Sequence, residues 1–356
     1  MAFITLDRNK LRENFSHLNG LFQKKGIEWA IVTKMLCGHE AYLQEVIDLG
    51  IQEICDARIS NLKKVKKLKP EIQTVYIKPP AKRSIKDVVK YADASFNTEL
   101  ETIKLLSAEA VKQDRLHKVI IMIELGDLRE GVMGTRLVEF YGSIFELPNI
   151  KVTGIGSNLN CLHGVMPSQD KLIQLSLYKQ LIEAKFDRQI PWVTGGTSVV
   201  IPLIYTHQLP VGINHFRVGE TLYFGADLVN GSVIEGMHHD VIKLYAEVIE
   251  ITKKPKVPIG NMEANPSGEM YEINTADYGK SSHRAILDLG LLDISTDYLI
   301  PEDQDFEFVG ASSDMLVIDL DDNDQGYKVG DLIPFDLKYM GALTLLNSDY
   351  IDKKVI

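Results

Sequence analysis

The sequence has few of the features that mark exported, membrane-spanning or disulfide-linked proteins. It contains only three cysteines, Cys37, Cys55 and Cys161, and none of them belongs to a CxxC pair. An odd number without paired spacing argues against a disulfide framework. The first residues turn polar too soon for a signal peptide, and no apolar run reaches the length of a membrane span. Together these absences indicate a reducing, cytoplasmic setting.

The chain also lacks an excess of positive charge. Its net charge is −10 over 356 residues, and an acidic protein repels the phosphates of nucleic acids and of anionic membranes. The one dense basic run, KKVKKLK at 63–69, has its apolar residues at helical spacing, so it indicates a solvated helix face. We therefore expect neither nucleic acid nor membrane as a partner.

A pattern of apolar, β-branched strands followed by helical stretches repeats from residue 27 to about 225. Eight strands alternating with helices predict a parallel sheet closed into a (β/α)8 TIM barrel. A doubly wound open sheet is the alternative, but no GxGxxG follows the first strand. The expected strands are 27–34, 53–58, 74–80, 94–98, 119–125, 151–157, 192–197 and 215–220.

After residue 230 the pattern changes to short strand-like runs separated by Gly, Asp, Asn and Pro. No long helical pattern remains there, so the sequence predicts a C-terminal all-β domain over 231–356, after a barrel domain over 1–230. Residues 1–6 form an extra strand outside the eightfold count, and this strand could pair with the C-terminal domain.

The residues at two strand ends suggest a binding site for a phosphate-bearing aldehyde. Active sites of barrels lie at the carboxyl ends of the strands, so these positions are informative. The turn TGGTS at 194–198 offers backbone N–H groups and two hydroxyls at a helix start, which suits a phosphate, although a capped turn is the ordinary alternative. Lys34 ends the first strand. Such a lysine usually reaches solvent, but a buried amine facing a phosphate site can form a Schiff base. Pyridoxal 5′-phosphate (PLP) fits both contacts.

Eight motifs spread over the whole chain resemble, in order, those of the alanine racemase family of PLP enzymes, and most of all its ornithine racemase-like branch. In that family a barrel precedes a C-terminal β domain. The motifs are VTKMLCGH (32–39), IELGDLREGVMGTR (123–136), GIGSNLNCLHGVMPS (154–168), TGGTS (194–198), FRVGETLYFG (216–225), RAILDLG (284–290), VGASSDMLVIDL (309–320) and SDYIDKK (348–354).

The resemblance implies a cofactor site in the barrel. Lys34 would be the Schiff-base lysine and one catalytic base, and Arg217 would bond the pyridine nitrogen. Asn158 stands where many alanine racemases have a histidine against the ring. The phosphate cup would consist of Gly196, Thr197, Ser198 and Gly219, with a hydroxyl from Tyr350.

The resemblance also implies an amino-acid substrate and a homodimer with shared active sites. Arg129 matches an arginine near the cofactor oxygen. Ser313 and Asp314 match a loop that reaches the substrate from the partner subunit. Asp314, Glu124 or Asp127 could hold the distal amine of a diamino acid such as ornithine or lysine.

Three positions depart from the alanine racemase pattern. Cys37 replaces a phosphate-binding tyrosine, and Met122 stands where many members have a carbamylated lysine. Racemisation needs a base on each face of the substrate, and Leu291 occupies the place of the tyrosine that serves as the second base. The sequence leaves that base open among Tyr278, Cys161, His163, Ser313 and Asp314.

These motifs predict an amino-acid racemase for a basic or other non-alanine substrate. An epimerase or decarboxylase of the same fold is the alternative, and a non-catalytic PLP-binding protein is a further one. No metal site is expected, because the MHH stretch at 237–239 lacks partner ligands.

Overall fold

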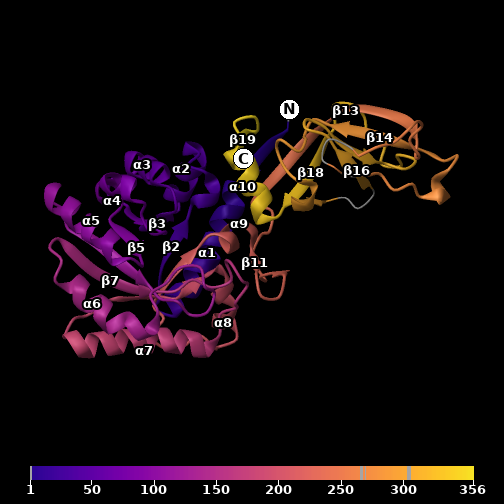
Figure 1. Cartoon of the computed structure of the whole chain (residues 1–356). Helices are drawn as coiled ribbons and strands as arrows, with labels where there is room; N and C mark the ends of the chain where they lie inside the picture. Colours follow the sequence, from indigo (N-terminus) through magenta and orange to yellow (C-terminus); the bar gives the residue numbers. More distant parts are fainter. Residues whose placement is uncertain (1, 265–267, 269, 303–305) are drawn as a thin grey trace. The chain divides into compact units, whose positions relative to one another are not determined.

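The computed structural model describes residues 2–264, 268, 270–302 and 306–356. The chain forms two compact units (Figure 1). The larger comprises Asp7–Val241 and Val355, and the smaller comprises Met1–Leu6, Ile242–Lys354 and Ile356. The sequence placed the domain border at 230/231. The structure keeps the short hairpin of β11 (Ala226–Asp227) and β12 (Ser232–Val233) with the larger unit, so that its division falls after Val241.

The larger unit is the expected parallel barrel, and all eight expected strands are present. Gly195 divides the seventh strand into β8, which pairs with β7, and β9, which pairs with β10; β10 in turn pairs with β2 and so joins the two ends of the sheet. The strands are β2 (Glu28–Val32), β3 (Glu53–Asp56), β4 (Gln73–Tyr76), β5 (Ala94–Asn97), β6 (His117–Met122), β7 (Ile150–Gly156), β8 (Trp192–Thr194), β9 (Gly196–Thr197) and β10 (His215–Val218).

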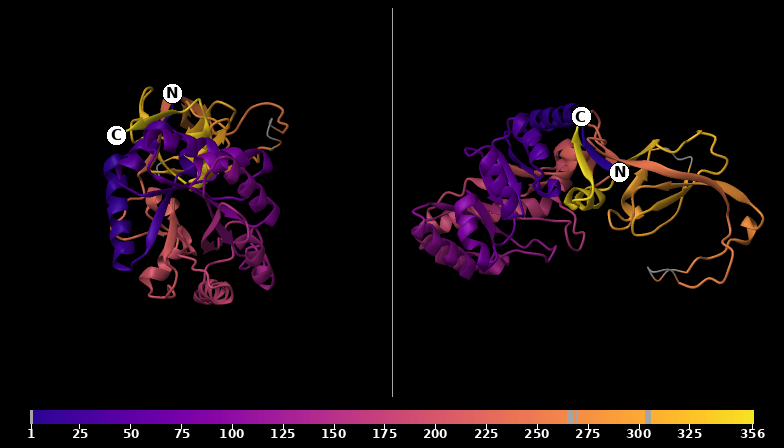
Figure 2. Two further views of the ribbon diagram at one scale, coloured as in Figure 1. Left: turned by 90° about the vertical axis from the view of Figure 1, so that its left-hand side faces the viewer. Right: turned by 90° about the horizontal axis from the view of Figure 1, so that it is seen from above.

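Helices follow the strands and cover the outside of the sheet (Figure 2). The basic run lies on α3, where Leu62 and Val65 are buried while Lys63 and Lys66 form ion pairs with Asp87 and Asp93. It is therefore a solvated helix face, as expected. The helices are α1 (Arg8–Lys24), α2 (Glu40–Asp48), α3 (Ile59–Leu68), α4 (Ile85–Tyr91), α5 (Leu100–Lys112), α6 (Leu137–Phe145), α7 (Gln169–Phe186), α8 (Ile201–Tyr205) and α9 (Glu220–Phe224).

The smaller unit is an antiparallel sheet in the order β15-β18-β13-β14-β17-β16, with β1 paired to β13 and to β19. It also contains a helix, α10 (Tyr339–Asn347), which the all-β expectation omitted. Ala342, Leu345 and Leu346 give α10 a buried face, but the pattern is too short to separate from the preceding strand in the sequence. The strands are β1 (Phe3–Leu6), β13 (Ile242–Pro255), β14 (Ser281–Leu287), β15 (Leu299–Pro301), β16 (Glu307–Ala311), β17 (Leu316–Asp319), β18 (Leu332–Leu337) and β19 (Asp352–Val355).

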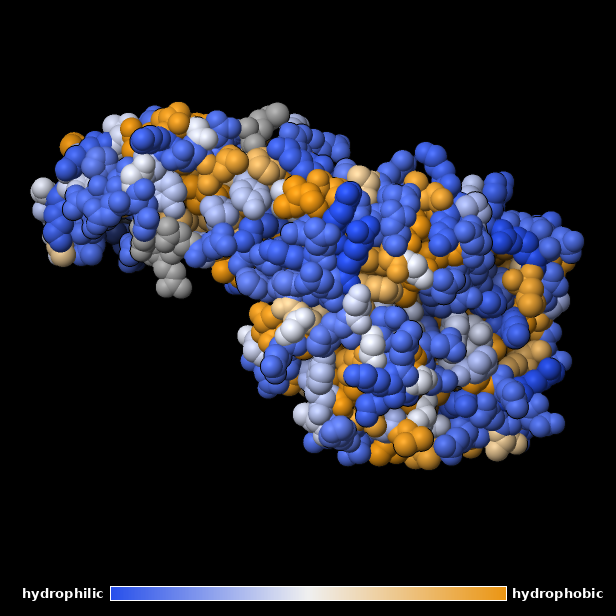
Figure 3. Space-filling view, turned by 180° about the vertical axis from the view of Figure 1, so that it is seen from behind, coloured by the Kyte–Doolittle hydropathy of each residue, from blue (hydrophilic) through white to orange (hydrophobic). Residues whose placement is uncertain are grey.

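The surface is mainly hydrophilic, with hydrophobic residues scattered over the face shown in Figure 3. On α7 the exposed apolar residues are Ile173, Leu177 and Leu181. Within the described part of the chain, none of the helices has the length and apolar character needed to cross a lipid bilayer.

Acid is expected to destabilise the barrel through His117 at the start of β6. This residue is buried, and its Nε2 lies 2.8 Å from Ser95 Oγ. Burial, with a smaller contribution from the charge of Arg115, lowers the pKa of His117 from 6.5 to about 4. Between these values the unfolded chain binds a proton that the folded chain does not. The free energy of unfolding therefore falls as the pH falls through this window.

Urea unfolding at pH 7 and at pH 4.5 measures this effect. We expect His117→Gln to lose about 2 kcal/mol less stability than the wild type between the two pH values, since a shift of one pKa unit corresponds to about 1.4 kcal/mol. The exposed His207 provides the control, as His207→Asn, which tolerates the left-handed backbone at that position. An equal acid sensitivity of wild type and His117→Gln would contradict the prediction.

Candidate active site

Three adjacent strands bring the predicted cofactor ligands to one edge of the barrel. Arg217 on β10 lies opposite Thr197 on β9 and opposite Ala30 on β2. Lys34 begins a short 3-10 helix just after β2, and Gly219 directly follows β10. The carboxyl ends of these strands therefore place Lys34, the Thr197 turn and Gly219 at the same end of the barrel, where active sites of this fold lie.

The turn after β8 approaches its neighbouring strand closely. A Cβ on Gly196 would lie 2.2 Å from the Phe216 ring, so no larger residue fits this position. Ser198 Oγ accepts a hydrogen bond from the backbone N–H of Thr221 at 3.3 Å, which ties the turn to α9. This fixed backbone cradle, with the hydroxyls of Thr197 and Ser198 beside it, fits a phosphate group.

Lys34 is exposed in this single chain. The Lys34 side chain is thus more exposed than the buried amine that the sequence led us to expect. Burial raises the pKa of Glu220 at the start of α9, and the positive charge of Lys34 opposes that rise. The lysine amine thus lies within electrostatic reach of α9, beside the proposed phosphate cup, and is accessible to an incoming aldehyde.

Arg217 is the buried charge of the site. Its Nη1 donates to Thr194 O at 2.5 Å and to Thr194 Oγ1, and its Nη2 donates to Ser157 O at 2.8 Å. The guanidinium carbon lies 5.1 Å from the centre of the Phe96 ring. Burial lowers the pKa of Arg217 to about 10, so the group stays charged at neutral pH.

The surroundings of Arg217 also fit a ring nitrogen. The Ser157 side chain, whose carbonyl accepts from Arg217, has a buried Oγ with no hydrogen-bond partner within the described part of the chain. An unpartnered hydroxyl is costly in a buried site without a ligand. PLP would supply acceptors, because its pyridine nitrogen and its phenolic oxygen both accept hydrogen bonds.

The loops after β6 and β7 are joined through Asp127. This buried carboxylate accepts hydrogen bonds from the backbone N–H groups of residues 161, 162, 163 and 165 at 3.0 to 3.3 Å. Burial raises the pKa of Asp127, but these four donors outweigh it, and the net shift is downward. Glu124 similarly accepts from the N–H groups of Gly126 and Leu128. Asp127 holds the loop after β7 and Glu124 holds its own loop, which disfavours both carboxylates as ligands of a substrate amine.

Arg129 and Asn158 lie on these two loops. Glu130 forms an ion pair with the Arg129 guanidinium and raises its pKa. Asn158 Nδ2 donates to Cys161 Sγ at 2.8 Å. Arg129 and Cys161 both lie within electrostatic reach of Arg217. Their roles toward cofactor and substrate stay predictions.

Of the second-base candidates on the barrel, His163 contacts the loop after β6, since its Nδ1 lies 2.8 Å from Asp127 O. Cys161 is exposed, and its Sγ accepts the hydrogen bond from Asn158. Tyr278 belongs to the smaller unit and is 61% exposed.

The smaller unit brings its own predicted residues together. The backbone N–H groups of Leu291 and Leu292 donate to the carbonyls of Ser312 and Ser313 at 2.9 and 3.0 Å. Asp314 and Tyr350 line a cavity of about 360 Å³, which Asp288 and Asp293 also line. Tyr350 and Asp314 thus share one acidic pocket, which the sequence motifs alone did not indicate.

Sequence reasoning missed Thr194, His215 and Glu53. These residues form a series of hydrogen bonds that leads to Arg217 on the inside of the barrel. A signal was present, since His215 and Arg217 are two residues apart on one strand and must face the same side of the sheet. Two polar residues on the inner face of a barrel strand are unusual where apolar layers are expected.

With this geometry described, the relationship to known proteins is clear. A model of the N-terminal domain of alanine racemase matches residues 6–227. The chain belongs to the alanine racemase family. Two relatives of this family align over nearly the whole chain. An ornithine racemase from Acetoanaerobium sticklandii is 38% identical over 354 residues, covering 99% of both proteins. A lysine racemase from Thermotoga maritima is 30% identical over 350 residues, covering 98% of this chain and 97% of that protein.

Solved structures of the family share the fold. Alanine racemase from Clostridium difficile 630 superposes with a TM-score of 0.75 at 16% identity, covering 100% of this chain and 95% of that one. Alanine racemase from Bartonella henselae with covalently bound pyridoxal phosphate superposes with a TM-score of 0.73 at 17% identity, covering 100% of this chain and 99% of that one. At this identity the likeness establishes the barrel and the β domain, and confirms the predicted fold class.

Proposed function

We propose that this protein racemises a basic amino acid, with ornithine as the preferred substrate, on PLP held by Lys34. The predicted amino-acid racemase function and the predicted cofactor are both confirmed by the comparisons. The preference for ornithine rests on the full-length similarity to ornithine racemase, which exceeds the similarity to lysine racemase. The residue assignments rest on the arrangement at the barrel edge.

PLP, when bound, withdraws electrons from the substrate α-carbon and so acidifies its hydrogen. The Lys34 amine would take up or return the α-hydrogen on one face, and a second base would return or take up a proton on the opposite face. The turn of Gly196, Thr197 and Ser198 would hold the phosphate through backbone N–H groups and hydroxyls. Arg217, a weak proton donor, would hold the ring nitrogen by a hydrogen bond without protonating it.

Asp314 would recognise the distal ammonium of the substrate. It is exposed and lies beside Asp293 and Tyr350 in an acidic pocket of the smaller unit, and carboxylates pair with a primary ammonium. In the dimer that we propose, this loop would serve the active site of the partner subunit. A cytoplasmic location fits the three free cysteines.

The reaction is tested by α-proton exchange in heavy water with both enantiomers of ornithine, lysine and alanine. We expect label in both enantiomers of ornithine, slower labelling with lysine and the slowest with alanine. A decarboxylase would release the amine, and a non-catalytic carrier would give neither product. Either result would end the racemase proposal.

Asp314→Asn is expected to raise KM for ornithine by at most about fivefold while leaving KM for alanine within about twofold, because an exposed charge pair contributes up to about 1 kcal/mol. Asp324→Asn, in an exposed turn of the same unit, is the matched control. Equal effects of Asp314→Asn on both substrates would exclude Asp314 as the ligand of the distal ammonium.

Shared active sites predict that subunits complement one another. Lys34→Ala and Asp314→Ala proteins, each impaired for ornithine, should recover activity when mixed under conditions that allow subunits to exchange. Recovery requires that one site of the mixed dimer receives both intact residues. A monomer in light scattering at working concentration would contradict the proposal.

A further inference from the structure

A line of buried polar groups crosses the inside of the barrel, where apolar layers are the rule. It runs from Arg217 through Thr194 and His215 to Glu53. Arg217 Nη1 donates to Thr194 Oγ1, Thr194 Oγ1 lies 2.7 Å from His215 Nδ1, and His215 Nε2 lies 3.1 Å from Glu53 Oε1. All four residues are at least nine-tenths buried.

The chemistry of the groups fixes the direction of this line. The ionised Glu53 carboxylate only accepts, so His215 Nε2 carries the ring hydrogen and donates to it. In the neutral imidazole Nδ1 then accepts from the Thr194 hydroxyl, whose oxygen accepts from Arg217. Every link is satisfied in one arrangement, and hydrogen bonds aligned in this way strengthen one another.

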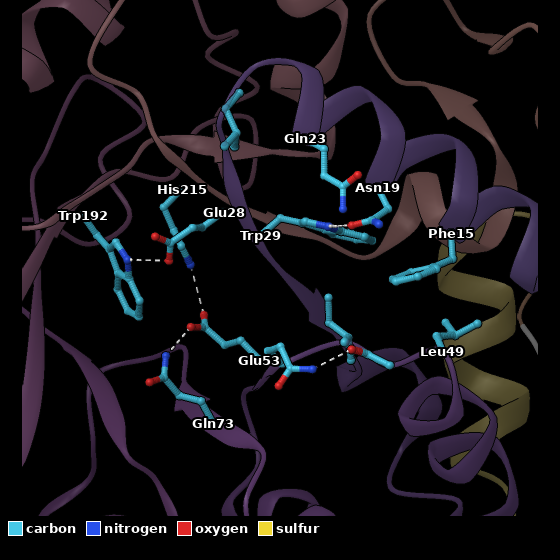
Figure 4. A pocket seen from close by; sticks show the side chains of 14 residues that line it. Phe15, Asn19, Gln23, Glu28, Trp29, Leu49, Glu53, Gln73, Trp192 and His215 are labelled. Carbon is cyan, nitrogen blue, oxygen red and sulfur yellow. Dashed lines mark hydrogen bonds and ion pairs between the residues drawn. The ribbon is translucent and has the colours of Figure 1, made fainter.

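Glu53 and His215, at the end of the line farther from Arg217, make further contacts with neighbouring side chains (Figure 4). Gln73 Nε2 donates to Glu53 Oε2, and the Trp192 ring stacks on His215 with the ring centres 4.6 Å apart. Trp192 Nε1 in turn donates to Glu28 at 3.1 Å. A cavity of about 610 Å³ opens here, lined by residues at the amino ends of the strands, opposite the end that carries Lys34.

We propose that Thr194, His215 and Glu53 are positioning residues that fix the Arg217 guanidinium for the cofactor ring nitrogen. The inference rests on the proposed role of Arg217. A carboxylate in direct contact with Arg217 would compete for the donors that face the cofactor. The compensating negative charge of Glu53 instead lies at the opposite end of the barrel. Thr194 and His215 stand between it and the guanidinium. Arg217 thereby keeps its orientation toward the cofactor.

Thr194→Val tests the proposal because it keeps the shape and removes only the hydroxyl. In the apoprotein titrated with PLP, we expect about tenfold weaker binding and a shifted visible absorbance band of the bound cofactor. Thr194→Ser should restore both properties. Thr153→Val, at a buried threonine of the neighbouring β7, is the matched control and should leave both unchanged. In the wild type, ¹⁵N resonances should show His215 with its hydrogen on Nε2.

Two results would overturn the proposal: Thr194→Val with the affinity and absorbance band of Thr153→Val, or His215 with its hydrogen on Nδ1. Arg217→Met separates this failure from that of the proposed function. If Arg217→Met changes the band and Thr194→Val does not, only the positioning role fails. If neither changes it, Arg217 does not hold the ring nitrogen, and the assignment on which this inference depends fails too.

Discussion

Replacing Lys34 with alanine is expected to lower racemisation by roughly 1000-fold or more, since both the covalent attachment and one proton-transferring group are lost. The visible absorbance band that borohydride abolishes in the wild type should be missing from the variant. The substitution removes the exposed amine at the edge of the barrel that also carries the cradle of Gly196 and Ser198. Steady-state kinetics and an absorbance scan measure both effects.

Lys104→Ala is the matched control for Lys34→Ala. Lys104 is a solvent-facing lysine on α5 whose ion pair with Glu101 is exposed and contributes little to stability. This variant should retain full activity and the full visible band. A Lys34→Ala protein that still carried a borohydride-sensitive band would place the covalent attachment on another lysine.

Arg217→Met is expected to lower the free energy of unfolding by about 3 kcal/mol, because buried acceptors that lose a charged donor cost about 1 to 3 kcal/mol each and partly readjust. The carbonyl of Ser157 would lose the Arg217 donor, and that of Thr194 would keep only the backbone N–H of Ser157 at 3.3 Å. Urea unfolding measures the change. Arg188→Met, at an exposed arginine, should alter stability by less than about 0.5 kcal/mol. An Arg217→Met protein as stable as the wild type would show that the buried guanidinium does not support the barrel.

The sequence was sufficient for the barrel because strand and helix periodicity is a local property. Each strand from Glu28 to Val218 is an apolar run followed by a turn, and such runs need no distant contact to be identified. Lys34 and the Thr197 turn were found for the same reason, since both immediately follow strands. Their grouping at one edge then follows from parallel pairing alone.

Other features depend on contacts that no local pattern encodes. Glu53 and His215 lie 162 residues apart in sequence and form a hydrogen bond only because the barrel closes. The exposure of Lys34 depends on which segments cover the barrel mouth. The acidic pocket of Asp314 and Tyr350 forms through folding of the smaller unit, and α10 was missed because its apolar pattern is short.

Four hydrogen bonds from backbone N–H groups to Asp127 join the loops after β6 and β7 into one structural module. A chimera that imported only one of these loops from a relative would separate a carboxylate from its four donors, leaving groups that the fold buries without partners. Grafting a new substrate preference onto this scaffold would therefore require both loops to be transplanted together.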